Sequence, residues 1–199
     1  LRDGLTAPEY QKKFVVTIAR KADRVNELLL TFHEYSRLDR PDMHVSKRRE
    51  DLCGLVQEYF AERYQELELA GFEVDAFIPE KSIWVCADRA LLRRAMENIV
   101  NNAAAYNPPG TKLTVEVPAE KGRAEIRIAD DGNGIPEEFK RDLFRPFVSG
   151  DTARGSGHGS GLGLAITAKI LELHGGNVCL EDPPPGGKGA VFALFLPCI

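Results

Sequence analysis

A glycine-rich run from Gly155 to Leu164 constrains the fold more than any other stretch of the sequence. Its five glycines exclude an ordinary helix or strand, because glycine loses the most backbone entropy when it becomes ordered. The residues that follow place apolar side chains at helical spacing, at Leu162, Ile166, Ile170 and Leu173. We therefore expect a glycine loop that leads into a helix N-terminus, where unpaired N–H groups and the helix dipole favour a phosphate group. The alternative for such a run by itself is a flexible linker.

The composition is that of an ordinary globular chain and argues against several classes of function. The 199 residues are 43% hydrophobic and 28% charged, which suits one core and an appendage. The net charge is -4, whereas domains that bind nucleic acid usually carry an excess of positive charge, so we expect no nucleic-acid partner. No run approaches the roughly 18 apolar residues of a spanning helix, and no signal peptide is evident, so we expect a cytoplasmic location. The four cysteines form no C-x-x-C pair, which argues against a zinc site.

Residues 9–38 are predicted to form one long helix. Apolar side chains recur there in steps of three and four, at Phe14, Ile18, Ala22, Val25, Leu29, Phe32 and Tyr35. A helix with such a stripe needs a partner, which we expect to be a helix from a preceding part of a longer protein or from a second chain. The alternative is a helix that packs on its own domain. Arg40-Pro41-Asp42 ends the pattern, and a linker to about Ser46 separates residues 1–42 from a second domain at 47–199.

The second domain is predicted to contain both helices and strands. Helices are expected at 48–70, 89–106, 135–144 and 162–174, with Asp88 as the cap of the 89–106 helix. Strands are expected at 72–78, 83–86, 113–117, 124–128, 177–180 and 190–196. One face of the 89–106 helix is apolar and is expected in the core, with Leu92, Met96, Ile99 and Ala103.

Two asparagines inside the 89–106 helix need a reason, because asparagine is a poor helix former. Asn98 and Asn102 are four residues apart and share a face that differs from the apolar one. The side chain of Asn102 offers a neutral oxygen, a hard ligand that suits a magnesium ion already carrying phosphate oxygens and water. The alternative is a solvated polar face.

A third stretch, Asp130-Asp131-Gly132-Asn133-Gly134-Ile135, follows directly on a predicted strand. A carboxylate at the strand end can accept a hydrogen bond from a buried amino group, while the glycine backbone closes over a flat ring. The alternatives are a plain acidic turn or a calcium-like turn, although the oxygen ligands are too few for a calcium loop. Phe144 and Phe147, which flank Arg145-Pro146, are placed to anchor the loop from Val148 to Ser160.

In this order, these stretches resemble the catalytic ATP-binding domain of sensor histidine kinases. Asn98-x-x-x-Asn102-Ala103 is similar to the asparagine box, and Asp130-x-Gly132-x-Gly134-Ile135 is similar to the first glycine box. Phe144-Arg145-Pro146-Phe147 is similar to the phenylalanine box, and Gly159-Ser160-Gly161-Leu162-Gly163-Leu164 is similar to the second glycine box. The resemblance spans roughly residues 48–199. Residues 1–40 resemble the end of the first helix and the whole second helix of the dimerisation and phosphotransfer domain.

The resemblance implies an α+β fold: a two-layer α/β sandwich of the Bergerat type, with a mixed sheet and helices on one face, preceded by a long helix of a dimeric four-helix bundle. It implies ATP and Mg2+ as cofactors, with Asn102 on the magnesium ion, Asn98 near the phosphates and Asp130 at the adenine amino group. Tyr106 matches the aromatic residue that borders the nucleotide. The full nucleotide-binding set that the resemblance implies is Asn98, Asn102, Tyr106, Asp130, Gly132, Gly134, Ile135, Phe147, Arg154, Gly159, Ser160, Gly161, Leu162, Gly163 and Leu164.

The function that the resemblance implies is transfer of the γ-phosphate of ATP to a histidine, for relay to an aspartate of a response regulator. The acceptor belongs on the first bundle helix, upstream of Leu1, so no catalytic residue is expected on this chain. His33 is followed by Glu34 but lacks the proline of the acceptor motif, and His174 is expected to be structural. The implied partners are a receiver domain and a second copy bound through the N-terminal helix, and the longer parent is expected to be a membrane-bound sensor.

Two positions depart from the family pattern, since Ala105 and Ser149 stand where basic residues are usual. Both would contact phosphate, and Arg154 is the candidate to compensate. The departures leave open a degenerate kinase that serves as a dimer scaffold or regulator. A gyrase-type or chaperone ATPase is a further alternative, but it needs a glutamate where Asn98 stands, and Glu97 is one residue away. A serine-directed anti-sigma kinase fits less well, because the long N-terminal helix suits a bundle.

Overall fold

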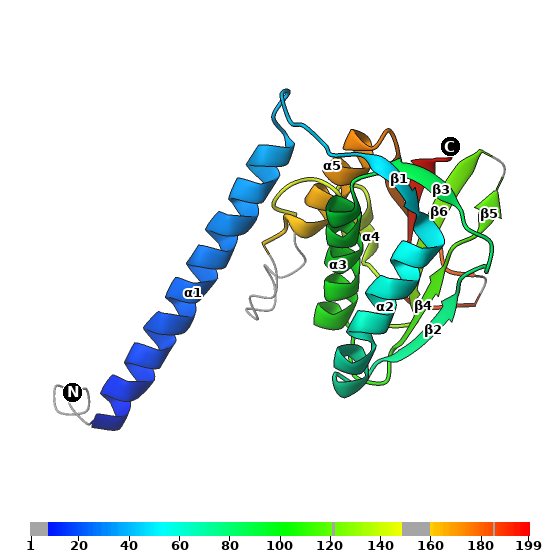
Figure 1. Cartoon of the computed structure of the whole chain (residues 1–199). Coiled ribbons are helices and arrows are strands. Elements are labelled where there is room, and N and C mark those ends of the chain that lie inside the picture. The colour runs from blue at the N-terminus through cyan, green and yellow to red at the C-terminus, as the bar shows by residue number, and fades with distance from the viewer. Residues whose placement is uncertain (1–7, 121, 149–159, 185) are drawn as a thin grey trace.

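The computed structural model describes residues 8–120, 122–148, 160–184 and 186–199. Figure 1 shows a long helix, α1 (Pro8–Leu38), next to a two-layer domain that holds the remaining elements. The C-terminal end of α1 lies beside α5 (Gly163–Leu173), while its N-terminal end stands away from the domain (Figure 1). The long helix predicted at 9–38 is confirmed. Within the described ranges, no helix combines the length and the apolar character needed to cross a membrane.

One layer of the domain is a mixed sheet with the strand order β2-β4-β6-β8-β7. Its strands are β2 (Glu73–Phe77), β4 (Lys112–Glu116), β6 (Arg123–Asp130), β8 (Ala190–Pro197) and β7 (Asn177–Glu181). β2 runs parallel to β4, and the other neighbours along this order are antiparallel. A short strand, β5 (Ala119–Glu120), also pairs with β6. The end of β6 pairs with the start of β8, which brings Asp130 opposite Ala190.

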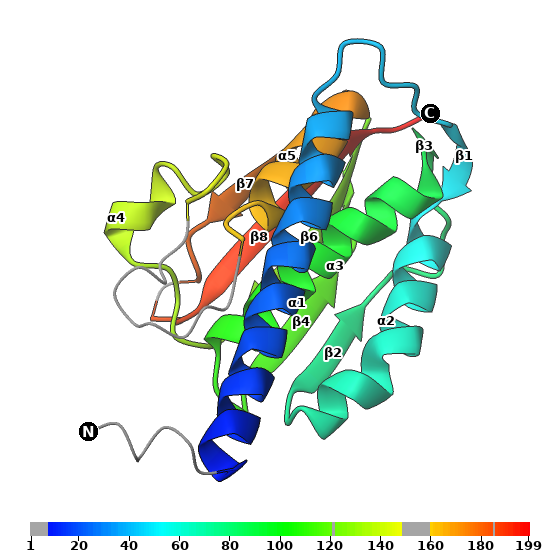
Figure 2. The same ribbon diagram turned by 90° about the vertical axis from the view of Figure 1, so that its left-hand side faces the viewer.

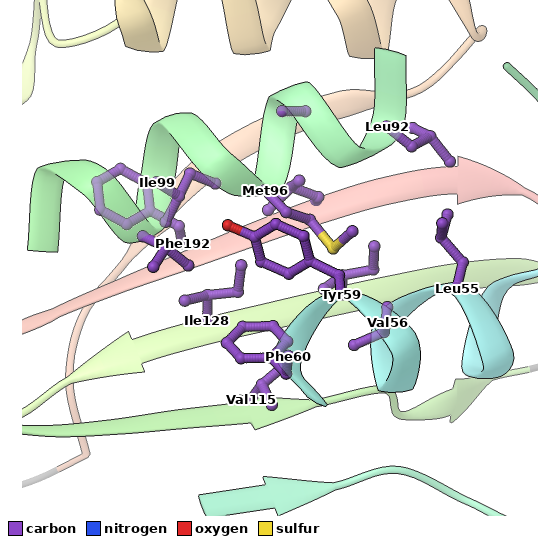
Figure 3. Packing of buried hydrophobic residues seen from close by; sticks show 14 of the residues in the cluster. Leu55, Val56, Tyr59, Phe60, Leu92, Met96, Ile99, Val115, Ile128 and Phe192 are labelled. Carbon is purple, nitrogen blue, oxygen red and sulfur yellow. The ribbon is translucent and has the colours of Figure 1, made fainter. Parts of the chain in front are cut away.

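The other layer consists of α2 (Leu52–Leu69), α3 (Arg89–Tyr106) and α5, which cover one face of the sheet (Figure 2). Apolar residues at helical spacing on these helices meet the inward-facing residues of the strands and form the core. Figure 3 shows this packing, with Leu55, Val56, Tyr59 and Phe60 of α2, Leu92, Met96 and Ile99 of α3, and Val115, Ile128 and Phe192 of the strands. The predicted α+β sandwich, with a mixed sheet and helices on one face, is confirmed.

A second, two-stranded sheet pairs β1 (Arg48–Asp51) with β3 (Trp84–Ala87). The prediction of a helix from residue 48 is therefore wrong for its first turn, since α2 begins at Leu52. The Asp51 carboxylate explains this start, because it accepts hydrogen bonds from the Cys53 N–H at 3.1 Å and from Ser82 Oγ at 2.6 Å and so caps the helix. The helix predicted at 135–144 is likewise shorter than expected, since α4 spans only Glu137–Lys140.

α3 has the predicted bounds, and Asp88 caps it by accepting hydrogen bonds from the Ala90 and Leu91 N–H groups. The Asp88 N–H donates to Nε2 of the buried His174 at 2.9 Å, and Nδ1 of that ring lies 2.7 Å from the Ile170 carbonyl oxygen. Burial lowers the pKa of His174, so the neutral ring is favoured in the folded chain. His174 therefore has a structural role, as predicted.

The apolar stripe of α1 divides into two parts. The first part is more than half exposed, with Phe14, Ile18, Val25 and Leu29. The last turns instead pack on the domain, since Leu38 is fully buried and Tyr35 packs against the core. Two ion pairs join the same region to the domain: Arg94 Nη2 of α3 lies 2.8 Å from Glu34 Oε2, and Lys169 Nζ of α5 lies 3.1 Å from Asp39 Oδ1. The C-terminal end of α1 thus belongs to the domain surface, and its N-terminal part keeps an uncovered apolar face.

Candidate nucleotide-binding site

Asn98, in the second half of α3, is buried and bonded to the start of α5. Its Nδ2 donates to the Gly163 carbonyl oxygen at 3.0 Å and to Thr167 Oγ1 at 3.4 Å. The Thr167 hydroxyl in turn donates to the Gly163 carbonyl oxygen at 3.1 Å. These bonds fix the first turn of α5 against α3. The first N–H groups of a helix have no acceptor within it, so the start of α5 is suited to bind an anion.

Asn102 lies one turn further along α3 and is half-buried. The nearby Asn98, Asn101, Asn107 and Asn133 all hydrogen-bond to protein groups, whereas the Asn102 amide makes no hydrogen bond within the part of the chain that the structure describes. Its oxygen is the hard, neutral type of donor that Mg2+ accepts beside phosphate oxygens and water. The described residues contain no group of three or more His, Cys, Asp or Glu able to hold a metal ion. Asn102 therefore fits a magnesium ion whose other ligands come from a nucleotide and water.

Asp130 ends β6, and its half-buried carboxyl group accepts a hydrogen bond from the Gly132 N–H at 3.1 Å. The Ala190 N–H and the Asn107 side chain also interact with this carboxyl group. Burial raises the pKa of Asp130, and these three interactions oppose that rise because they stabilise the charged form. The carboxylate is thus held by its own loop, by β8 and by the end of α3.

The loop after Asp130 is bonded to the C-terminal end of α3. Asn107 Oδ1 accepts from the Asn133 N–H at 2.9 Å, and Asn133 Nδ2 donates to the Tyr106 carbonyl oxygen at 3.0 Å. Gly132 lies so close to the Asn107 amide that a Cβ atom at position 132 would overlap it. A side chain at position 132 would have to displace the Asn107 amide, which bonds to the Asn133 N–H, and this close packing gives a physical reason for the first glycine of this stretch.

The next turn of the loop packs toward β8 and the core. Gly134 has a φ of 71°, and a Cβ atom there would lie 3.1 Å from the Gly189 carbonyl oxygen. Ile135 is half-buried and packs against the core cluster. A cavity of about 320 Å3 lies beside this turn, lined by residues 133–136 together with residues of the β7–β8 connection. Its lining does not include the asparagines of α3 or Asp130.

Phe147 and Gly161 are hydrogen-bonded to each other on either side of the residues 149–159. The Phe147 N–H donates to the Gly161 carbonyl oxygen at 2.8 Å, and both residues have positive φ, 65° and 66°. A Cβ atom on Gly161 would lie 2.8 Å from the Phe147 carbonyl carbon, so only glycine fits. The Phe147 ring is largely exposed and stacks on Phe32 of α1, with ring centroids 6.4 Å apart. The predicted nucleotide-binding residue Phe147 thus also contacts α1.

The last predicted residues lie at the start of α5 or just before it. Ser160 Oγ accepts from the Leu162 N–H at 3.2 Å, Leu162 is buried in the core, and Leu164 packs against the core. Arg154 and Gly159, both predicted to bind nucleotide, lie outside the described residues, as does Ser149.

The three stretches singled out in the sequence therefore meet around the second half of α3. Asn98 bonds to the start of α5, and Asn107 and Tyr106 bond to the loop that carries Asp130. Sequence reasoning missed Asn107 and Thr167, whose hydrogen bonds hold these contacts together. Asn107 directly follows a predicted helix. Polar side chains at helix ends often hydrogen-bond to groups outside the helix, so this position was the signal that could have identified Asn107.

The sandwich, the asparagine helix and the glycine segment define the class of the molecule, a two-layer nucleotide-binding domain. Residues 87–198 match the family described as Histidine kinase-, DNA gyrase B-, and HSP90-like ATPase, and the chain belongs to this family. It is 31% identical over 198 residues to the sensor-like histidine kinase SenX3 of Mycobacterium tuberculosis, a match that covers 99% of this chain and 47% of SenX3. The chain thus spans about half the length of this relative.

Two solved structures illustrate the likeness. Full-length ShkA, in complex with AMPPNP, is 25% identical with a TM-score of 0.76, over 94% of this chain and 39% of ShkA. The histidine kinase ThkA, in complex with the response regulator protein TrrA, is 24% identical with a TM-score of 0.73, over 100% of this chain and 54% of ThkA. At 24% identity, the likeness to ThkA concerns the fold alone. The chain therefore corresponds to the ATP-binding catalytic part of sensor histidine kinases, together with a long preceding helix.

Proposed function

We propose that the chain binds ATP with Mg2+ along the second half of α3, and that within a longer protein it transfers the γ-phosphate to a histidine that lies outside this chain. The observation that carries this proposal is the place of Asn102. Its amide makes no hydrogen bond to protein in the described structure. It lies on α3 between two residues whose side chains do contact other elements. Asn98 fixes the start of α5 on one side, and Asn107 fixes the Asp130 loop on the other.

This arrangement provides a group of the right chemistry for each part of ATP. Asp130 accepts a hydrogen bond from the adenine amino group, and Tyr106 borders the base. About 12 Å of helix separates Tyr106 from Asn98, which leaves room for the ribose and phosphates between the Asp130 loop and the start of α5. The start of α5 binds phosphate oxygens through its first N–H groups, which have no acceptor within the helix. Asn102 binds the magnesium ion, which when present neutralises charge on the transferring phosphate.

The remaining residues of the predicted set contribute by shape and by backbone groups. Gly132 and Gly134 allow the loop to pack closely on α3 and β8, and Ile135 supplies an apolar wall. Gly163 contacts α3 through its bond with Asn98, and Gly161 is bonded to Phe147, so the described part of this segment, from Ser160 to Leu164, lies next to α3. Arg154 supplies the positive charge that Ala105 and Ser149 lack. Positioning and charge neutralisation are the main contributions of protein groups to phosphoryl transfer.

The uncovered apolar face of α1 supports the proposal that a second copy and a preceding helix complete a four-helix bundle. The acceptor histidine would lie on that preceding helix. ThkA, which shares the fold, is known in complex with a response regulator, and we propose a receiver domain as the partner that takes the phosphate from the acceptor histidine.

The contacts of Glu97 favour a kinase over a gyrase-type ATPase. A gyrase-type enzyme needs a glutamate that can activate water at the nucleotide. Glu97 Oε2 lies 2.8 Å from Arg94 Nη1, and its other oxygen lies 3.9 Å from Arg63 Nη1, so its carboxylate is paired with an arginine of α3 and an arginine of α2. Asn98, the residue at the position in question, cannot act as a base.

Thermal unfolding with and without millimolar Mg-ATP tests the nucleotide site. A ligand at 100 times its dissociation constant stabilises the folded state by about 2.7 kcal/mol, which corresponds to roughly 5–10 °C for a domain of this size. We expect such an increase for the unmutated chain and none for Asn102→Ala. Asn101→Ala is the matched control, because Asn101 is exposed and bonded to Arg63 instead. An unchanged melting temperature of the unmutated chain in Mg-ATP would refute the proposal.

Incubation with labelled ATP tests the place of the acceptor histidine. It should leave no acid-labile phosphate on this chain, and label on His33 would contradict an acceptor outside the chain.

A further inference from the structure

We propose that Asn107 is a positioning residue that sets the preference of the site for a 6-aminopurine, because it holds the Asp130 carboxylate and its loop against the end of α3. This inference rests on the proposed nucleotide site and adds a residue to it. Asn107 is the C-cap of α3, with an extended backbone (φ -110°, ψ 150°), and its N–H still bonds to the Ala103 carbonyl oxygen at 3.1 Å. The helix end therefore fixes the backbone from which the side chain extends.

The two partners of the Asn107 amide determine its orientation. Oδ1 accepts from the Asn133 N–H at 2.9 Å, and the same side chain stabilises the charged form of the Asp130 carboxyl group. An N–H can only donate and an ionised carboxylate can only accept. The carbonyl side of the amide must therefore face Asn133, and its NH2 side must face Asp130. No other orientation satisfies both partners.

The count of acceptor positions on Asp130 shows what this arrangement selects. An ionised carboxylate offers about four lone-pair positions. The Gly132 N–H fills one of them at 3.1 Å, and the Ala190 N–H and the Asn107 NH2 also stabilise the charged carboxyl group. A position that these groups leave open can accept from a ligand donor, such as the exocyclic amino group of adenine. A 6-oxopurine presents a carbonyl oxygen at that place, which meets the carboxylate as two acceptors facing each other.

The packing of Gly132 gives a second reason to assign this role to Asn107. The loop backbone lies directly on the Asn107 amide, since a Cβ atom on Gly132 would overlap it. A truncated side chain at position 107 removes both the NH2 donor and the surface on which the loop lies. The Asp130 carboxylate is then no longer held in the orientation that directs its open acceptor position toward the base.

The experiment compares the dissociation constants of Mg-ATP and Mg-ITP, measured by calorimetry at pH 8, for the unmutated chain and three variants. Inosine triphosphate differs from ATP only in the base, which has a carbonyl at position 6 in place of the amino group and a proton on N1. Asn107→Ala removes both contacts of the amide, and Asn107→Asp keeps the shape and the acceptor for Asn133 but places a second carboxylate beside Asp130. Asn133→Ala is the matched control, since it removes the bond to the Tyr106 carbonyl oxygen at the same junction and leaves the Asn107–Asp130 bond in place.

We expect the preference for ATP over ITP to fall by about tenfold or more in both Asn107 variants, as loss of a polar group that stabilises the charged carboxylate predicts. The ratio in Asn133→Ala should stay within about twofold of the unmutated value, because loss of a neutral bond that does not involve the Asp130 carboxyl group affects both nucleotides equally. A general structural role of Asn107 would weaken both nucleotides alike and leave the ratio unchanged. If Asn107→Ala does not fold, the isosteric Asn107→Asp provides the same comparison.

The outcomes separate this inference from the function on which it rests. An unmutated chain that binds neither nucleotide overturns both. An unmutated chain that binds ATP, with an unchanged ATP-to-ITP ratio in the folded Asn107 variants, overturns the role of Asn107 alone. A ratio that falls as much in Asn133→Ala as in Asn107→Ala also overturns it, because the whole junction would then be responsible.

Discussion

The pair of Glu34 on α1 and Arg94 on α3 should stabilise the docking of α1 on the domain. Arg94 Nε lies 2.9 Å and 3.2 Å from the two Glu34 oxygens, and Arg94 Nη2 lies 2.8 Å from Oε2. Both side chains are mostly buried, with 31% and 23% of their surface exposed. Hydrogen bonds between charged groups of this kind stabilise by about 1.5–3 kcal/mol.

The net effect of the pair should lie at the lower end of this range. Arg94 also bonds to Glu97 at 2.8 Å, so Glu34→Ala does not leave the guanidinium group without a partner. Partial exposure weakens the attraction further. We therefore expect a coupling free energy of about 1–2 kcal/mol between the two side chains, which changes the docking equilibrium roughly 5–30-fold.

Amide hydrogen exchange in a double-mutant cycle measures this coupling. Glu34→Ala, Arg94→Ala and the double variant are compared for exchange of residues 28–38, relative to residues 123–130 of β6 as an internal reference. Glu27→Ala is the control, because the Glu27 side chain is 65% exposed and, among the residues that the structure describes, its carboxylate pairs only with Arg24 of the same helix, at 3.3 Å. Its effect on docking should stay below about 0.5 kcal/mol. A coupling no larger than this control effect would refute the argument that a charged pair fixes α1 to α3.

Two further predictions concern groups buried near the site. Asn98→Asp should lower the free energy of unfolding, measured in urea without nucleotide, by about 1–3 kcal/mol, because an oxygen then faces the Gly163 carbonyl where Nδ2 now donates. Asn101→Asp is the control, since Asn101 is exposed and the change should have little effect. Equal losses in both variants would count against the Asn98 bond. Burial lowers the pKa of His174, so its contribution to stability is complete above the unfolded value of about 6.5 and is lost as the pH falls below it. Urea midpoints at pH 7.5 and 5.5 should therefore differ less in His174→Gln than in the unmutated chain, and an equal difference would show that another group is responsible.

The elements that local sequence determines were predictable. α3 has its predicted bounds because Asp88 caps its start and Asn107-Pro108 ends it, and both signals are local. The first turn predicted for the second helix was wrong because Arg48–Asp51 pair with β3, a contact across more than thirty positions that periodicity does not reveal. The stripe of α1 was predicted as a helix face, but the burial of Leu38 in the domain core depends on tertiary packing.

The site was predictable as a set of stretches, and less so as a set of contacts. The asparagine spacing and the glycine runs indicated α3, the Asp130 loop and the start of α5, which the structure brings together. The positive φ of Phe147 and its stacking on Phe32 could not be predicted, because both arise from the approach of Gly161 and of α1. The hydrogen bonds of Asn107 were missed because Asn-Pro-Pro-Gly indicates a turn, and a turn residue alone does not show what its side chain contacts.

The stacking of Phe147 on Phe32 links two parts of the molecule with different tasks. Phe147 is bonded to Gly161, next to the start of α5, and its ring lies on the helix that leaves the domain. If a nucleotide at α5 changes the position of Phe147, it changes the affinity of the domain for α1. Thermodynamic reciprocity then requires that displacement of α1 alter nucleotide affinity by the same free energy. A rotation applied at the N-terminal end of α1 would thus change the fraction of domains that hold ATP.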